Sequence, residues 1–358
     1  MAINLAEKYE KKIAEGFAQE SVVAAACNND YNWDGVRAIN VYSPEYQDLQ
    51  DYKRTGSNRY GEPKELQDTV NRMEITRDRS FAITIDKGNN KEQMETKEAG
   101  RVLRGEMKFK ALPEMEKYAL GRFIDHAGKI DALTAAPTTE TIVEKLSDGM
   151  VHLSNKNVPD DRTIFIGWTY FGMLRISKQF IGIDALGTKA LVKGSLGTFM
   201  GAQVIPLPDE YLKKGNSQCY FLIVSKTAAV FPKKINDMKL HKDPPGYNGA
   251  LLEGRFLYDA FIIGKKVDGV YAAVAASTKQ ANPTFAFSGN TLTVTSAGST
   301  AVFVTTDGSD PRFSLSAIKT TSGGAVTLPT GKTKAKAVAF DDALFTSDVV
   351  EDTERTVS

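Results

Sequence analysis

The residues of this 358-residue chain that could perform metal or nucleophilic chemistry are few and scattered. None of its three histidines, His126, His152 and His241, belongs to an HExxH pair or has cysteines or paired carboxylates nearby. The two cysteines, Cys27 and Cys219, form no CxxC pair and are typical of structural thiols in a reducing compartment. The sequence also lacks a GxSxG elbow, a Walker phosphate loop and a GxGxxG turn between strand and helix. We therefore predict no catalytic residue, no metal, no cofactor and no enzymatic activity.

One loop brings side-chain oxygens close enough together in the sequence to suit a calcium ion. The segment 304–312, VTTDGSDPR, contains Asp307, Ser309 and Asp310, and calcium prefers oxygen ligands. The segment lacks the spacing and the terminal glutamate of an EF-hand loop. Because Asp, Gly, Ser and Pro are also the residues that tight turns use, the composition favours a structural turn.

Basic residues cluster on a stretch with helical periodicity that contains Arg101, Arg104 and Lys108. The whole chain has a formal charge of only +1, so it has no global excess of positive charge with which to hold nucleic acid. A solvated helix face is the simpler interpretation, because acidic residues lie near each basic cluster. The alternative is that these three side chains face enclosed DNA, where phosphate contacts need no base recognition.

A charged segment without a hydrophobic core of its own is a second candidate for function. Residues 45–74 are dominated by charge, turn formers and tyrosine, and strand-like alternation flanks them, which predicts a long hairpin with its tip at 54–58. Compact domains rarely keep so long a loop unsupported, so it is either a mobile surface loop or a segment that docks on another copy. In the second case Arg54, Arg59 and Lys64 are the contact candidates, because long cationic side chains suit carboxylates on a partner.

The N-terminus has the pattern of a short amphipathic helix. Leu5, Tyr9, Ile13 and Phe17 recur every four residues among charged side chains. Such a helix is marginal alone in water, so its apolar side needs a surface on its own domain or on a neighbour, and we predict an N-terminal arm that makes contacts between subunits. No apolar core of a signal peptide and no run of roughly 20 apolar residues is present, which predicts a soluble protein made in the cytoplasm.

These candidates need helices and strands to position them. A long helix is predicted over 90–126, which Pro113 must interrupt or kink, and a second helix has its apolar face from Ile142 to Leu153. Short apolar runs predict buried strands that together form one sheet, at 163–168, 203–207, 218–225, 253–263 and 269–274. The alternation of helices and strands predicts an α+β fold.

The composition changes sharply near residue 280. Of the 77 residues from Asn282 to Ser358, 24 are Ser or Thr, and helical patterning disappears. Short alternating runs separated by Gly, Pro and Asp turns are typical of a small β-sandwich. We therefore predict a second, all-β domain over 282–358.

Several stretches of the first 280 residues occur in an order that resembles tailed-bacteriophage major capsid proteins of the Hong Kong 97 type. They are DYKRTGSNRYGEPKEL, FAITIDKGN, NVPDDRTIFIGWTYFGML, GTFMGAQVIPLPDEYL and LLEGRFLYDAFIIGKKVDGVYA. The resemblance implies a major capsid domain over 1–281 whose parts are an N-arm (1–38), an extended loop (39–86), a spine helix (90–126), an axial domain (about 136–230) and a peripheral sheet completed by 231–281. It implies subunits that assemble as pentamers and hexamers into an icosahedral virion shell around double-stranded DNA. A separate scaffolding protein and a portal protein would be further partners.

Residues 284–350 resemble a different family, the immunoglobulin-like domains related to the C-terminal domain of chitobiase. The stretches that carry the likeness are VFVTTDGSDPRFS and GKTKAKAVAF. The resemblance implies a domain displayed on the capsid surface that stabilises the shell or binds glycans weakly. Two other interpretations stay open: an encapsulin-like compartment shell, and a carbohydrate-binding accessory protein, whose enzymatic form would need a carboxylate pair that the sequence does not offer.

Overall fold

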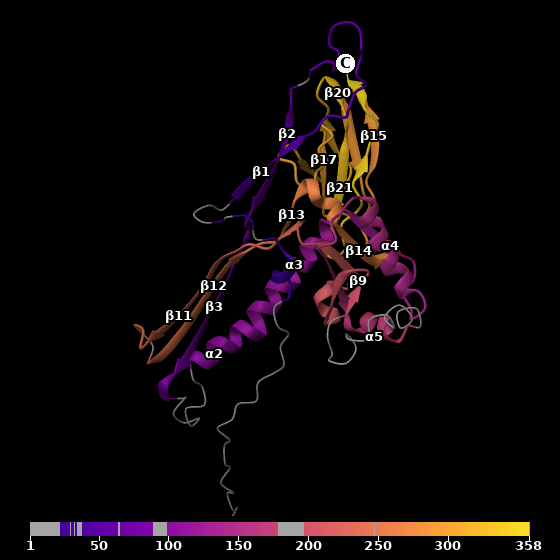
Figure 1. The fold of residues 1–358 in the computed structure, drawn as a ribbon. Coiled ribbons are helices and arrows are strands. Elements are labelled where there is room, and N and C mark those ends of the chain that lie inside the picture. Colours follow the sequence, from indigo (N-terminus) through magenta and orange to yellow (C-terminus); the bar gives the residue numbers. More distant parts are fainter. Residues whose placement is uncertain are drawn as a thin grey trace, which may run out of the picture.

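A computed structural model of the chain describes residues 22–28, 30, 31, 33, 38–63, 65–88, 99–177, 197–246 and 248–357. It has mixed helices and strands, which confirms the α+β prediction (Figure 1). The described part contains no helix that is both long and apolar enough to span a membrane. Short elements between the main layers are η1 (Ala24–Ala26), η4 (Asp209–Leu212), η5 (Gly264–Gly269), η6 (Ala276–Thr278), β10 (Ala229–Val230) and β13 (Phe261–Ile262).

The central layer is a mixed sheet with the strand order β4-β14-β9-β5-β7-β6, and β8 pairs with β9. Its strands are β4 (Lys129–Leu133), β5 (Arg162–Gly167), β6 (Thr198–Phe199), β7 (Ala202–Leu207), β8 (Lys213–Lys214), β9 (Ser217–Ser225) and β14 (Val270–Ala275). Strands β4 and β14 are parallel, as are β5 and β7, and the other neighbours are antiparallel. Four of the five predicted strands lie in this sheet.

Helices cover both faces of the central sheet, which explains why its strands read as continuous apolar runs. On β9, Phe221 and Ile223 pack under α4 (Ile142–Asn155) and α5 (Trp168–Ile176), while Leu222 and Val224 belong to the core under α3 (Leu112–Asp125). The buried face of α4 runs from Ile142 to Leu153, as its periodicity predicts.

The long helix is interrupted as Pro113 requires. Its described part consists of α2 (Ala99–Glu106), a π-helical turn η2 (Met107–Ala111) and α3, with Pro113 in the first turn of α3. The amide of Leu112 donates to the carbonyl of Met107, five residues back. Proline lacks an amide donor, so the wider turn falls where the α-helical bonding pattern cannot be completed.

A second, three-stranded antiparallel sheet extends away from this body alongside α2 (Figure 1). Its order is β11-β12-β3, formed by β11 (Lys233–Lys242), β12 (Gly249–Tyr258) and β3 (Arg77–Asp86). The prediction that 253–263 joins the central sheet was therefore wrong. Strand β11 is not apparent in the sequence, because the sheet is open to solvent here and even Met238 and Leu240 are exposed.

The predicted hairpin is present as β1 (Ala38–Glu45) and β2 (Gln67–Glu74), a two-stranded sheet in which Ala38 pairs with Glu74 and Glu45 with Gln67. Residues 46–66 between the strands contain no described helix or strand. A small cluster anchors the base: Trp33, Met73 and Ile75 are buried, and Trp33 stacks on Phe261 with ring centroids 5.6 Å apart.

The C-terminal part is entirely β-structure and has its own core. Its sheets are β15-β16-β19, β18-β17-β21-β22 and β20-β23. The strands are β15 (Thr284–Ser288), β16 (Thr291–Thr295), β17 (Ala301–Thr305), β18 (Ile318–Thr320), β19 (Gly324–Thr327), β20 (Gly331–Thr333), β21 (Lys336–Phe340), β22 (Val350–Glu351) and β23 (Arg355–Val357). Residues such as Leu292, Val304 and Ala337 are fully buried among them.

Candidate assembly surfaces

The tip of the β1–β2 hairpin is ordered by its own backbone rather than by a core. The amide of Lys53 donates to the carbonyl of Arg59 at 2.9 Å, and the rings of Tyr52 and Tyr60 meet edge to face with centroids 5.0 Å apart. Gly56 and Asn58 have positive φ angles of 90° and 53°, as a tight reversal requires. The tip is thus a formed turn at the end of a long arm.

The same arm exposes a row of large apolar and aromatic side chains. Tyr46 is 84% exposed and Tyr60 88%, and Tyr42, Leu49, Tyr52 and Leu66 are exposed as well. Single exposed apolar residues are normal, but six on one extended segment without a core form a surface that is more stable when another molecule covers it than in contact with water. The side chains that favour contact here are mainly aromatic, so the cationic residues chosen from the sequence are only part of this surface.

The cationic candidates on the tip are exposed. Arg54 has no partner among the described residues, and Arg59 donates from Nε to the carbonyl of Gly56 at 3.2 Å. Lys64 lies outside the described residues. Arg54 is therefore available to a carboxylate of another chain, while Arg59 also supports the turn.

The N-terminal candidates Leu5, Tyr9, Ile13 and Phe17 lie outside the described residues. The first described segment, 22–28, is held against α3: the buried carboxylate of Glu116 accepts from the amide of Val22 at 2.9 Å. The amide of Asn28 donates to the carbonyl of Ala229 at 2.7 Å. The part of the predicted arm (1–38) that the structure describes therefore includes a segment that lies against α3.

The basic candidates on the spine differ in exposure. Arg104 and Lys108, four residues apart, are exposed, whereas Arg101 is half-buried and takes part in an interaction of its own. The Lys108 ammonium lies 5.8 Å from the centroid of the Phe109 ring, near the limit for a cation–π contact. Two of the three side chains can thus reach a partner outside the subunit.

The C-terminal β-unit is fixed to the end of α3 by a buried polar junction that no sequence pattern indicates. The carboxylate of Asp125 accepts from the Lys214 ammonium at 2.9 Å and from the amide and hydroxyl of Thr346 at 3.3 and 3.1 Å. Beside them Phe345 is fully buried in the core under α3. Because Asp125 and Thr346 are 221 residues apart, only the folded chain brings them together.

A second contact of this junction caps the C-terminus of α3. The Arg312 guanidinium donates to the carbonyl of Ala127 at 2.7 Å and pairs with Asp310 at 2.7 Å. Cations are favoured at this end of a helix. Nearby, His126 donates from Nδ1 to the carbonyl of Arg122 at 3.0 Å, and its pKa lies well below the ordinary value because of burial and of the charges on Arg122 and Arg312. His126 is therefore a neutral core residue.

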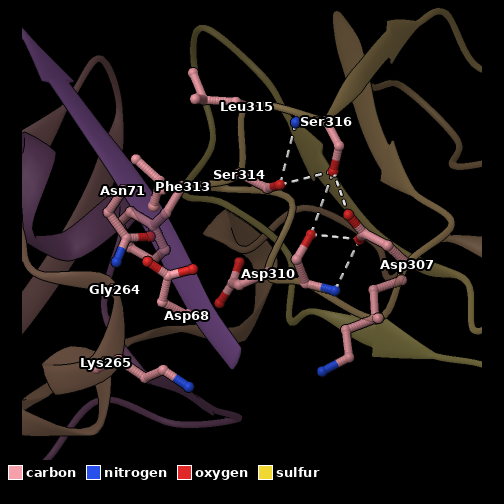
Figure 2. Close-up of a pocket in the computed structure, with 14 residues that line it drawn as sticks. Asp68, Asn71, Gly264, Lys265, Asp307, Asp310, Phe313, Ser314, Leu315 and Ser316 are labelled. Atoms are coloured by element: carbon pink, nitrogen blue, oxygen red, sulfur yellow. Dashed lines mark hydrogen bonds between the residues drawn. The ribbon is translucent and has the colours of Figure 1, made fainter. Parts of the chain in front are cut away.

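The loop considered for calcium is a turn, as its composition favours. Asp307 accepts from the amide of Ser309 at 3.0 Å and from the hydroxyl of Ser316 at 2.6 Å (Figure 2). Hydrogen bonds from these serines hold the pKa of Asp307 below its ordinary range, although its burial acts most strongly and in the opposite direction. In the described part of the chain, no group of three or more His, Cys, Asp or Glu side chains could hold a metal ion.

This turn also contacts the hairpin arm. Asn71 of β2 and Ser314 form an antiparallel bridge, and Figure 2 shows Asp68 and Asn71 on β2 facing Asp310 and Ser314. Between them lies an open pocket of about 520 Å³. The C-terminal unit thus touches both α3 and the base of the arm, and it limits the directions in which the arm can point.

The two cysteines are buried free thiols, which confirms their structural interpretation. The Cys27 thiol donates to the carbonyl of Val23 at 3.2 Å, and burial raises its pKa to about 12. Burial also raises the pKa of Cys219 far above its ordinary value. Neither thiol is a reactive nucleophile, since reactivity requires the thiolate.

No protein-family model matches the sequence, and no curated protein matches it either. The fold, in contrast, is similar to that of several phage structures. A chain from a structure of Mycobacterium phage Che8 is 16% identical with a TM-score of 0.64, over 76% of this chain and 98% of that one. A chain from the capsid structure of cyanophage P-SCSP1u is 12% identical with a TM-score of 0.62, over 76% and 93%. One from the mature capsid of bacteriophage PhiM1 is 11% identical with a TM-score of 0.58, over 75% and 91%. At these identities the likeness concerns the fold, and this chain shares its fold with phage capsid structures.

Proposed function

We propose that this chain is the major capsid protein of a tailed bacteriophage, a structural subunit that acts by assembling with copies of itself. The observation that carries the proposal is the fold likeness, which extends over almost the whole length of each phage capsid chain, 91% to 98%. The exposed aromatic arm supports it, because such a surface has a use only if another molecule covers it. Catalysis has no place in this proposal.

The segments of the chain take the roles that the Hong Kong 97-type resemblance implies. Residues 39–86 form the extended loop, 90–126 the spine, about 136–230 the axial domain, and 231–281 complete the peripheral sheet. Subunits assemble into pentamers and hexamers of an icosahedral shell around double-stranded DNA, with a scaffolding protein and a portal protein as partners. Of the three basic spine residues, Arg104 and Lys108 face the DNA, whereas the half-buried Arg101 does not. Arg54, Arg59 and Lys64 contact neighbouring subunits.

Residues 282–358 form an immunoglobulin-like unit on the outer surface of the shell. The unit has its own core, and the phage structures leave about a quarter of this chain uncovered, a share close to its length. We propose that it stabilises the shell, since the junction at Asp125 and Arg312 fixes it to the spine. Weak glycan binding by this unit stays a prediction. Incubating the purified chain with a glycan array tests it.

Electron microscopy of the purified chain, expressed alone and together with candidate scaffolding proteins, tests the proposal. We expect closed icosahedral shells with small protrusions. Nuclease-protected DNA in particles from infected cells would distinguish a virion from an encapsulin-like compartment. A chain that stays monomeric under every co-expression condition would contradict the capsid function.

A further inference from the structure

A small cavity lies where the last turn of α3, the base of β2, strand β13 and the loop before β18 meet. Its volume is about 210 Å³, and Phe261 and Phe313 are among the side chains that line it. Three arginines, Arg72, Arg122 and Arg312, also line this cavity. So much positive charge in one partly enclosed space requires negative charge to balance it.

Two of the three arginines are balanced within the chain. Arg72 pairs with Glu74 at 3.0 Å, and Arg312 pairs with Asp310 at 2.7 Å besides donating to the carbonyl of Ala127. Among the described residues these two cations therefore have both charge partners and hydrogen-bond acceptors.

Arg122 has neither. Its Nε is buried without any hydrogen-bond partner, and no described residue forms an ion pair with its guanidinium. The position near the end of α3 explains why a cation is tolerated, since the helix dipole favours positive charge there. The dipole does not supply an acceptor for the buried Nε–H group, and an unsatisfied buried donor is destabilising. The neighbouring His126 is neutral, so it neither balances nor adds to the positive charge of the cavity.

We propose that this cavity binds a small oxyanion of the phosphate class, with the Arg122 guanidinium as its principal ligand. A guanidinium presents a planar fork of donors that matches two oxygens of such an anion, and charge-assisted bonds of this kind are strong. The cavity is large enough for one phosphate with a few water molecules and too small for a drug-sized organic ligand. The inference is independent of shell assembly, because every residue it uses belongs to one chain.

Calorimetric titration of the full chain with inorganic phosphate at constant ionic strength tests the inference, and thermal unfolding provides a second readout. We expect binding to the natural chain and a rise of Tm with phosphate concentration. Arg122→Met should unfold at a higher temperature than the natural chain without phosphate, because an unpaired cation is removed, and should lose the binding. Arg255→Met is the matched control: Arg255 is an exposed arginine paired with Asp78, outside the cavity, and this variant should bind phosphate normally.

Phosphate also stabilises proteins in general, because it is excluded from their surface. The test is therefore whether phosphate raises the Tm of Arg255→Met more than the Tm of Arg122→Met, and a rise of Tm in the natural chain alone is not sufficient. If Arg122→Met does not fold, Arg122→Lys keeps the charge without the fork and should bind at least tenfold more weakly. No calorimetric binding to the natural chain, or equal binding to the Arg122 variants, would overturn the inference.

Discussion

Individual ionisable residues in this chain hold parts of the molecule together. Asp125, Arg312 and Glu116 each connect segments more than 90 residues apart in the sequence. The three histidines and two cysteines, which a sequence search for chemistry considers first, are packing or surface residues. The residues with the largest structural roles are therefore ordinary charged side chains that nothing in the sequence singles out.

Removing the charge of Asp125 should loosen the C-terminal unit. In Asp125→Asn the Lys214 ammonium stays largely buried without a counter-ion, so we expect the free energy of unfolding to fall by about 2 to 3 kcal/mol. Asp78→Asn is the matched control, because Asp78 pairs with Arg255 on an exposed sheet and should contribute less than about 1 kcal/mol. Urea denaturation of both variants measures the difference, and equal losses would contradict this role of the junction.

His126 makes stability depend on pH in a defined direction. Its folded pKa lies well below the ordinary 6.5, because of burial first and of Arg122, Arg312 and Lys214 next. The unfolded chain therefore binds a proton that the folded chain does not, and stability decreases as the pH falls below 6.5. We expect a slope of about 1.4 kcal/mol per pH unit from this residue until its folded pKa is reached.

Urea denaturation between pH 7.5 and pH 5 measures this slope. His126→Asn keeps a donor for the Arg122 carbonyl but does not titrate, so the slope should become shallower. His241→Gln, at an exposed position that contacts Glu253, should leave it unchanged. An unaltered slope in His126→Asn would mean that other groups cause the pH dependence.

At the scale of elements, apolar periodicity in the sequence predicted the helices and strands whose position depends on burial of their own side chains. Helix α4 and strands β5, β7, β9 and β14 follow from apolar periodicity, because each buries a face or is covered on both sides. The pairing of β3 with β12 could not be predicted, since Arg77 and Tyr258 are 181 positions apart and their sheet is open to solvent. The hairpin arm was predictable because its composition excludes a core, whereas the aromatic surface on it became evident only from exposure.

The aromatic side chains of the arm should matter for assembly and not for folding. Replacing Tyr42 and Tyr46 with Ser removes two rings that are 65% and 84% exposed, so the Tm of the free subunit should change little. Shell formation should be strongly reduced, because aromatic residues are frequent hot spots of interfaces. Trp168→Ser, a comparably large exposed ring on α5, serves as a control for general loss of surface aromatics. Size-exclusion chromatography and electron microscopy measure shell formation by the double variant. Normal shells would contradict the prediction.

At the scale of the whole molecule, the C-terminal unit is part of the architecture rather than an appendage. It contributes Phe345 to the core under α3, Arg312 to the end of that helix and Ser314 to a bridge with β2. Figure 1 shows its strands at the end of the molecule opposite the β3–β12–β11 sheet. The unit therefore belongs to the side of the subunit from which the hairpin arm extends.

Truncation after residue 281 should consequently destabilise the part that remains. We expect a lower Tm for residues 1–281 than for the full chain, since the core loses Phe345 and the buried Asp125 loses the two hydrogen bonds from Thr346. Phe345→Ala in the full chain should reproduce much of the loss, about 3 to 5 kcal/mol. Differential scanning calorimetry of the full chain, residues 1–281 and Phe345→Ala measures these changes. An unchanged Tm after truncation would indicate that the C-terminal unit does not stabilise the rest of the chain.

The π-helical turn at Met107–Ala111 marks the place where this helix can change its length. Its hydrogen bond spans five residues instead of the four of an α-helix, so the loss of one residue within this turn can restore a regular α-helical turn and keep Arg104 and Lys108 on the same side of the spine. The loss of one residue inside α2 or α3 would instead rotate the segments on its two sides by about 100°, because an α-helix advances by that angle per residue. We therefore expect natural variants to differ within α2 and α3 by exchange of side chains, and to place insertions and deletions at this turn or in the loops.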